Sequence, residues 1–188
     1  PSLIGGCIWD WSDQGITRHI DGAYGNQIKD IHKAHKESLK PESDYYWAYG
    51  GDFDDTPNDG NFCMNGVMMS DLSASPKTVE VKKAYQNIAF KIIDKEDGIV
   101  EITNKFLVTN LSDFNFYWTL LEDGKVKTKG VVPVELSGSN TAKFILDNYV
   151  SSLNSNSEYI LQLEAKTTKK TKWAEAGHVV AWEEFVIQ

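Results

Sequence analysis

The residues best suited to chemistry lie between Tyr49 and Gly66. This segment holds four aspartates and three asparagines among glycines, two phenylalanines, a cysteine and a methionine. It has too many turn formers for a helix and too many large apolar groups for a solvated linker. We therefore predict a long loop that is fixed by its own packing, a kind of loop that commonly carries function.

Clustered carboxylates are the first candidates in this loop. Asp52, Asp54, Asp55 and Asp59 could provide acid–base chemistry or a metal site. A calcium loop of the EF-hand type is excluded, because Pro57 stands at its middle ligand position. The alternative is that these aspartates stabilise turns on an acidic surface, and the residue types leave both interpretations open.

Amide and main-chain oxygens are the second candidates. Asn58 and Asn65 carry side-chain oxygens, and an irregular loop leaves carbonyls free that a helix or strand would use. Hard cations take ligands of this kind, so the loop is a candidate cation site.

The histidines and the common catalytic motifs offer less. His32 and His35 are spaced to share a metal from one helix, but no third ligand accompanies them, so we expect structural or surface roles. His19 and His178 are isolated. Neither a Gly-x-Ser-x-Gly elbow nor a phosphate-binding glycine loop occurs in the sequence.

Two tryptophans flank Asp10 near the N-terminus. In an extended chain Trp9 and Trp11 point to the same side and Asp10 to the other. The pair could pack in a core, or an indole at the mouth of a barrel could form a platform for a sugar ring.

The first element expected to position these candidate residues is a short apolar run at the N-terminus. Leu3–Trp11 predicts a strand buried on both faces, as in parallel sheets. Asp10 and Asp13 stand at its carboxyl end, where α/β barrels and open α/β sheets build their sites. The next segment, Gly15–Trp47, is polar and irregular.

Two helices are expected in the first half of the chain. Gln27–Leu39 has near-helical apolar spacing and ends before Pro41, and Ser75–Tyr85 starts with Ser75 as N-cap and Pro76 at the first helical position. Val67–Met69 predicts a brief extended segment between them.

From Ile88 onward the pattern changes to short β-rich runs. Asp97-Gly98 and Asp123-Gly124 stand at hairpin positions, the latter as a two-residue turn. Such strands without helices predict an antiparallel sandwich of about 100 residues, joined to the first part near Gln86–Phe90. The expected strands are Phe90–Ile93, Ile99–Ile102, Phe106–Val108, Phe114–Leu121, Val126–Val134, Ala142–Leu146, Tyr159–Glu164 and Val179–Ile187.

Composition and charge exclude several classes of function. A net charge of −8 argues against a nucleic-acid partner, and the one basic cluster, Lys169, Lys170 and Lys172, is expected to be a solvated turn. No apolar run reaches the length of a membrane span. Cys7 and Cys63 leave a disulfide open as an alternative, but two buried free thiols are expected. The absence of a starting methionine suggests a processed protein or a piece of a longer one.

Several stretches together resemble the family 2 glycoside hydrolases that are β-galactosidases. Gly5–Gln14 is similar to the last barrel strand of that family and Glu80–Gln86 to its last barrel helix. Ile16–Tyr46 looks longer than the family's loop. The loop after the strand is matched by Tyr49–Phe53, Asp55–Asp59 and Phe62–Gly66, and the sandwich, more weakly, by Trp173–His178.

The resemblance implies an α/β plus all-β fold. Residues 1–87 would be the last β/α unit of a (β/α)8 catalytic barrel, and residues 88–188 an antiparallel immunoglobulin-like β-sandwich. The parent would be a retaining enzyme that hydrolyses terminal β-D-galactosides with two glutamates. Both lie upstream in the family, and Glu37, Glu42 and Glu80 match neither, so we expect no catalytic residue here and an inactive fragment. The alternative is a non-catalytic carbohydrate-binding or structural module.

The resemblance also implies substrate and metal contacts. Trp9 matches the tryptophan that faces the galactosyl ring. The Phe62 carbonyl and the Asn65 side chain match ligands of a sodium ion that meets the sugar, and Asn58 matches a residue near a divalent cation. The implied cofactors are therefore Na⁺ and Mg²⁺, bound weakly or not at all by the fragment alone.

The expected partners are a β-galactoside, the remainder of the parent chain and a second copy in a homo-oligomer. Nucleic acid and membrane are not expected. Apolar groups around Ile4–Trp11 would drive self-association if no barrel covers them. We expect a soluble protein, cytoplasmic or periplasmic, with the compartment left open.

Overall fold

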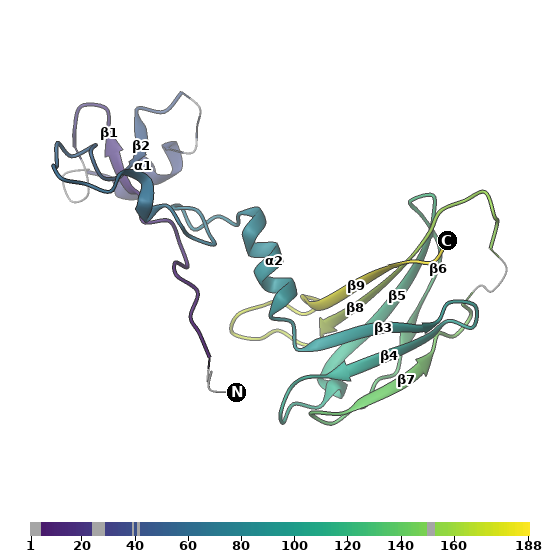
Figure 1. Cartoon of the computed structure of the whole chain (residues 1–188). Coiled ribbons are helices and arrows are strands. Elements are labelled where there is room, and N and C mark those ends of the chain that lie inside the picture. The colour runs from purple at the N-terminus through teal and green to yellow at the C-terminus, as the bar shows by residue number, and fades with distance from the viewer. Residues whose placement is uncertain (1–4, 24–28, 39, 41, 150–152) are drawn as a thin grey trace. The chain divides into compact units, whose positions relative to one another are not determined.

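The computed structural model describes residues 5–23, 29–38, 40, 42–149 and 153–188 (Figure 1). The chain divides into two compact units, one up to Lys82 and one from Lys83 onward. We call them the N-terminal and the C-terminal unit and describe each by itself. The division predicted from the sequence, after residue 87, stays a prediction.

The C-terminal unit is built from two antiparallel sheets, which Figure 1 shows as separate layers. The first has the order β3-β4-β7 and the second the order β6-β5-β8-β9. A short 3₁₀ helix, η3 (Leu111–Asp113), precedes β5. The strands are β3 (Ile88–Asp94), β4 (Ile99–Asn104), β5 (Phe114–Glu122), β6 (Lys125–Val132), β7 (Thr141–Ile145), β8 (Tyr159–Thr167) and β9 (Val179–Val186).

One hydrophobic core lies between the two sheets. Alternate residues along β4, β5 and β8 are buried, as expected for strands with one face on a core. Phe90 of β3 meets Phe116 of β5 edge to face, with ring centroids 6.3 Å apart. Both sheets thus contribute to one buried cluster. Seven of the eight strands predicted from the sequence are present in this unit.

The turn between β5 and β6 confirms the two-residue hairpin. Asp123 and Gly124 have φ values of 47° and 75°, the left-handed pair that a type I′ turn requires. Asp97-Gly98 closes the longer turn between β3 and β4.

The predicted strand at Phe106–Val108 does not form. Asn104 is fully buried, and its Nδ2 donates to the carbonyls of Thr109 and Leu136 at 2.8 and 2.9 Å. Its Oδ1 accepts the Phe106 N–H at 3.0 Å. These bonds hold the segment as a loop, and its apolar side chains at Leu107 and Val108 face solvent.

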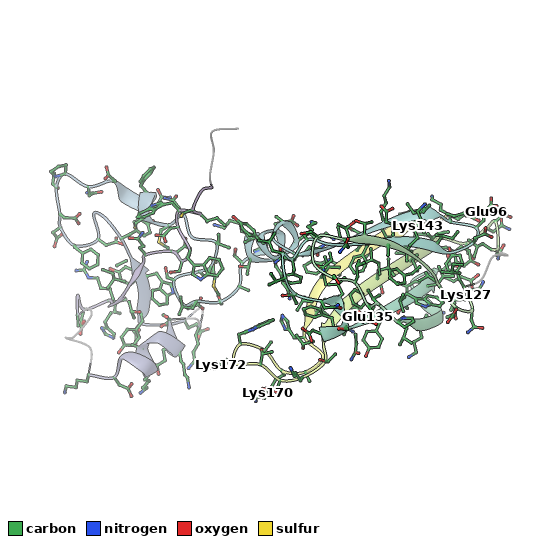
Figure 2. The ribbon with its side chains drawn as sticks, turned by 90° about the horizontal axis from the view of Figure 1, so that it is seen from below. Glu96, Lys127, Glu135, Lys143, Lys170 and Lys172 are labelled. Atoms are coloured by element: carbon green, nitrogen blue, oxygen red, sulfur yellow. The ribbon has the colours of Figure 1, made fainter. Side chains whose placement is uncertain are left out.

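The basic cluster is solvated, as predicted. Lys170 and Lys172 lie on the exposed loop between β8 and β9 (Figure 2). Lys170 forms an exposed ion pair with Glu175 at 2.5 Å.

The N-terminal unit contains short elements. They are β1 (Ile16–His19), α1 (Ile31–Glu37), β2 (Tyr45–Ala48), the 3₁₀ helix η2 (Gly60–Cys63) and α2 (Pro76–Ala84), whose end belongs to the C-terminal unit. Asp30 caps α1 by accepting the Lys33 N–H at 2.9 Å. Both predicted helices are confirmed, although residues 27, 28, 39 and 41 of the first prediction lie outside the described residues. Ser75 precedes α2, and its hydroxyl donates to the Val67 carbonyl.

The sequence reading missed the hairpin formed by β1 and β2. These strands pair antiparallel, from Ile16 opposite Ala48 to His19 opposite Tyr45, within a segment that we expected to be irregular. The aromatic run Tyr45-Tyr46-Trp47 was the available signal, because aromatic residues favour strands.

The strand predicted over Leu3–Trp11 is also wrong for the described residues 5–11. No strand forms there, and Trp9 and Trp11 are exposed. A strand buried on both faces needs neighbouring strands along its edges and further layers packed on both faces. Within the described residues, the end of this segment pairs only with Val67 and Met68, next to a parallel bridge between Ser12 and Met68.

Both cysteines are free, but Cys7 is exposed and Cys63 only partly buried, which corrects the expectation of buried thiols. Among the helices that the structure describes, none is long and apolar enough to cross a membrane.

Candidate functional site

All four residues singled out for binding surround one open hollow of about 410 Å³ in the N-terminal unit. They are Trp9, Asn58, Phe62 and Asn65, which come from two segments separated by about fifty residues of chain. The remaining lining residues are Gln14, Gly50, Asp55, Asp59, Gly60 and Cys63.

A short parallel pairing brings the two segments together. The Val67 N–H donates to the Asp10 carbonyl at 3.0 Å, and the Met68 N–H to the Trp11 carbonyl at 2.9 Å. The Asp13 N–H returns a bond to the Met68 carbonyl at 3.0 Å. These bonds place Trp9 beside the segment that carries Phe62 and Asn65.

Gly66 lies at the tightest point of this pairing. Its N–H donates to Asp13 Oδ1 at 2.7 Å, and a Cβ added to it would come within 2.0 Å of the Asp13 nitrogen. Glycine is therefore required here by the close approach of two backbones.

Trp9 presents its indole to solvent, with 83% of the residue exposed. The neighbouring Asp10 carboxylate accepts the Trp11 N–H at 2.6 Å and the side-chain amide of Gln14. Packing in a core does not explain an exposed Trp9, whereas the sugar-platform interpretation requires an accessible ring face and stays a prediction.

Two of the four aspartates of the loop act as turn stabilisers. Asp52 accepts the Tyr49 N–H at 3.0 Å, and Asp55 accepts the Gly51 N–H at 2.9 Å. This is the behaviour expected of Asx side chains. Within the described part of the chain, no three acidic, histidine or cysteine side chains are grouped to hold a metal.

Asn58 is also engaged by the loop. Its Nδ2 donates to the Asp55 carbonyl at 2.8 Å, and its Oδ1 accepts the Gly60 N–H at 3.0 Å. Its side-chain oxygen serves the backbone of the loop, so the arrangement does not fit a divalent cation at this residue.

Phe62 and Asn65 offer a better fit to a cation. Asn65 Nδ2 donates to the Phe62 carbonyl, so an electropositive group already faces this oxygen. A half-turn of the Asn65 amide would present its Oδ1 on the same side. Two neutral oxygens of this kind suit a hard cation, which would need further ligands.

Among the histidines whose side chains the structure describes, none lines the hollow. His19 lies edge to face with Tyr45, with ring centroids 4.8 Å apart, and its Nδ1 is 2.9 Å from Asp21. Backbone bonding from Ala23, and then the His19 contact, lower the pKa of the Asp21 carboxyl. The side chains of His32 and His35 lie outside the described residues.

Sequence reasoning missed two contributors. It gave no role to Gln14, which lines the hollow, and it noted Asp13 only as a polar residue at the end of a predicted strand. The signal for Asp13 was that position, because carboxyl ends of strands are where sites are built.

Comparisons with known proteins cover both units. A model of the family described as "Glycosyl hydrolases family 2, TIM barrel domain" matches residues 1–90. A model described as "Beta-galactosidase, domain 4" matches residues 100–188.

Similar proteins include a β-galactosidase of Priestia megaterium, 37% identical over 188 residues, which are 100% of this chain. β-Galactosidases of Yersinia pseudotuberculosis and Yersinia pestis are 33% identical over 185 residues, or 98% of this chain. The chain spans 16% of the length of each of these relatives. Because the two family matches and these relatives cover the chain almost from end to end, it belongs to the β-galactosidases of glycosyl hydrolase family 2, as a segment of such a protein.

Proposed function

We propose that this chain supplies one wall of the galactose-binding pocket of a retaining β-galactosidase. The observation that carries the proposal is the convergence of Trp9, Phe62 and Asn65 on one hollow, although Trp9 is distant from the other two in sequence. The hollow is open, which suits a wall that other parts of a longer protein complete.

We assign the N-terminal unit to the end of the catalytic barrel and the C-terminal unit to an immunoglobulin-like sandwich. The two antiparallel sheets support the second assignment. So does Tyr159 at the start of β8, whose hydroxyl accepts the Asn154 N–H, five residues upstream, at 3.1 Å. A tyrosine bonded in this way to upstream backbone is a feature of immunoglobulin-like sandwiches.

Trp9 would hold the sugar by stacking. The C–H groups on one face of a galactosyl ring form an apolar patch, and a flat indole buries that patch while the hydroxyl groups stay at the edge. The exposure of Trp9 leaves its ring available for this contact.

Phe62 and Asn65 would hold a sodium ion next to the sugar through the Phe62 carbonyl and Asn65 Oδ1. The ion would supply a fixed positive charge that orients a sugar hydroxyl oxygen. We assign no step to a magnesium ion, because both polar atoms of Asn58 are engaged by the loop.

Bond cleavage would depend on residues outside this chain. A retaining glycosidase needs two carboxyl groups about 5–5.5 Å apart, one as nucleophile and one as acid/base. Among the described residues, no glutamate lines the hollow. Two aspartates do, Asp55 and Asp59, and the Asp55 carboxylate already accepts the Gly51 N–H, so the lining offers no pair of available carboxyl groups. We therefore expect the 188-residue chain to bind sugar without hydrolysing it.

Tryptophan fluorescence tests the binding role. Titration with galactose in sodium buffer should quench Trp9 emission with a dissociation constant of roughly millimolar order. The change should vanish in Trp9→Phe, and its sodium dependence should vanish in Asn65→Ala. Asn61→Ala is the matched control, since Asn61 belongs to the same 3₁₀ helix but does not line the hollow.

Failure would have distinct forms. An unchanged fluorescence in the unsubstituted chain would contradict a binding wall and leave the alternative of a structural module. Cleavage of nitrophenyl galactoside by the purified chain would contradict the placement of both catalytic glutamates outside it. Trp9→Phe, purified in the same way, is the control for contaminating hydrolases.

We also propose a homo-oligomeric parent and self-association of the fragment through exposed apolar groups such as Trp9 and Trp11. Light scattering of the purified chain tests this, and a monomer across a wide concentration range would contradict it.

A further inference from the structure

We propose that Asn65–Gly66 is a site of spontaneous deamidation, and that Asp13 controls its rate by binding the Gly66 N–H. The proposal concerns the chemistry of this chain and does not depend on sugar binding.

The dipeptide itself is chemically labile. In an Asn-Gly pair the glycine nitrogen attacks the asparagine Cγ easily, because no side chain on the second residue obstructs the approach. The N–Cγ bond forms, the Cγ–Nδ2 bond breaks, and ammonia leaves with the proton from the glycine nitrogen. Water then opens the cyclic imide to aspartate or isoaspartate. Asn65–Gly66 is the single Asn-Gly pair in the sequence.

Packing leaves no room for a residue other than glycine at position 66. A Cβ at residue 66 would lie 2.0 Å from the Asp13 nitrogen and 2.5 Å from the Met68 carbonyl oxygen. The tight pairing thus imposes glycine directly after an asparagine, and the lability of the pair has to be limited by other means.

Asp13 slows deamidation by acting on the Gly66 nitrogen, the atom that attacks Asn65 Cγ. Asp13 Oδ1 lies 2.7 Å from the Gly66 nitrogen, within the range of a charge-assisted hydrogen bond. A negatively charged acceptor holds the proton on this nitrogen and opposes the loss of that proton, which attack requires. The bond also directs the nitrogen toward the Asp13 carboxylate.

A second contact restrains the group under attack. In the chain without a bound sodium ion, Asn65 Nδ2 donates to the Phe62 carbonyl, which holds the amide toward η2 (Gly60–Cys63). Deamidation would remove this donor and place a carboxylate beside the carbonyl oxygen. On the proposed function, the product would also change one wall of the sugar pocket.

The test is the rate of deamidation, followed by peptide mapping with mass spectrometry during incubation at mildly alkaline pH. In Asp13→Ala, conversion of Asn65 should be about tenfold faster or more, because a charge-assisted bond to the reacting nitrogen is lost. Asp13→Asn keeps an oxygen acceptor without the charge, so its rate should lie between those of Asp13→Ala and the unsubstituted chain.

A matched control separates this effect from loosening of the unit. Asp52→Ala also removes a carboxylate that accepts a backbone N–H, from Tyr49 at 3.0 Å, and should leave the Asn65 rate within about twofold. The Asn154-Ser155 and Asn156-Ser157 pairs in the C-terminal unit serve as internal references.

Three results would overturn the proposal. The first is an Asn65 rate in the unsubstituted chain that equals the rate in urea. The second is an Asp13→Ala rate equal to that of the unsubstituted chain. The third is equal acceleration in Asp52→Ala. None of these outcomes involves galactose, so they are distinguishable from failure of the binding experiment.

Discussion

The two units differ in where their apolar side chains lie. The C-terminal unit encloses its large apolar residues in one core, with Trp118, Leu120 and Leu161 at 0–1% exposure. In the described part of the N-terminal unit, the buried apolar residues are small, namely Ala34, Ala48 and Val67. Several of its large apolar groups, among them Trp9, Trp11, Ile20, Phe62 and Leu72, are exposed.

The two units are therefore stabilised by different interactions. The C-terminal unit gains stability from burial of apolar area. The N-terminal unit relies on backbone and side-chain hydrogen bonds such as Gly66 N–H to Asp13, and it leaves exposed the groups that would meet a ligand or other protein surface. A site built in this way is open, and it depends on a few exact contacts.

The largest loss of stability should come from a cavity in the core of the C-terminal unit. Leu161 is fully buried in β8, between β5 and β9. Leu161→Ala should lower the free energy of unfolding by about 2–5 kcal/mol, through lost burial and the cavity left behind. Urea denaturation measures it.

Leu107→Ala is the matched control for that experiment. Leu107 belongs to the same unit but is 85% exposed, so its removal should change the free energy of unfolding by less than about 0.5 kcal/mol. Equal effects of the two substitutions would contradict the view that burial between the sheets stabilises this unit.

An intermediate effect should follow when the N-terminal unit loses its tightest contact. Gly66→Ala introduces a Cβ that the Asp13 backbone cannot accommodate, so the two segments must separate at a cost of about 1–3 kcal/mol. Amide hydrogen exchange at Val67 and Met68, which donate to Asp10 and Trp11, should become faster.

Gly6→Ala provides the comparison, because nothing lies within 4 Å of a Cβ added at Gly6. Its exchange rates at Val67 and Met68 should match those of the unsubstituted chain. Unchanged exchange in Gly66→Ala would show that the N-terminal unit does not depend on this pairing.

The same contrast explains what the sequence could predict. Strands of the C-terminal unit alternate between core and solvent within one chain, so their pattern is local and seven of them were found. Phe106–Val108 failed because Asn104, a buried polar residue, bonds to the backbone of the loop. No periodicity encodes such a bond.

In the N-terminal unit, the lining of the hollow was anticipated better than the secondary structure. Trp9, Phe62 and Asn65 were identified by resemblance and do meet at one hollow. The strand over Leu3–Trp11 failed because its apolar pattern requires neighbours that the described residues do not provide. Gln14 and the bond from Gly66 to Asp13 became visible only in three dimensions.

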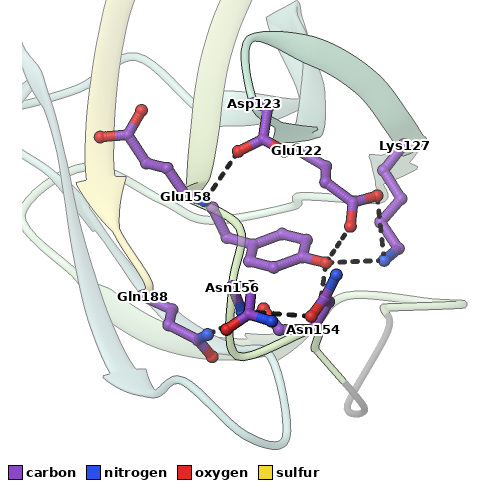
Figure 3. A network of polar contacts seen from close by, with 8 residues as sticks. Glu122, Asp123, Lys127, Asn154, Asn156, Glu158 and Gln188 are labelled. Atoms are coloured by element: carbon purple, nitrogen blue, oxygen red, sulfur yellow. Dashed lines mark hydrogen bonds and ion pairs between the residues drawn. The ribbon is translucent and has the colours of Figure 1, made fainter.

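The smallest effect concerns a polar network at one end of the C-terminal sandwich (Figure 3). The buried Tyr159 hydroxyl donates to Glu122 and accepts from Lys127 Nζ at 3.0 Å. The bond from Tyr159, with the nearby Lys127 adding to it, lowers the pKa of the Glu122 carboxyl below its ordinary value of 4.5. A carboxyl whose pKa is lowered on folding stabilises the protein above its unfolded pKa, and this contribution is lost as the pH falls through the folded pKa.

Tyr159→Phe should therefore weaken stability at neutral pH by about 1–2 kcal/mol, since Glu122, Lys127 and the Asn154 N–H lose a shared partner. It should also reduce the loss of stability below pH 4.5, because the main cause of the lowered Glu122 pKa is gone. Urea midpoints at neutral and acidic pH measure both effects.

Tyr117→Phe removes a hydroxyl from β5, outside the contacts made by Glu122, and should leave the acid dependence intact. An identical acid dependence in Tyr159→Phe and the unsubstituted chain would show that Glu122 does not link this network to the stability of the sandwich, which would then rest on its apolar core alone.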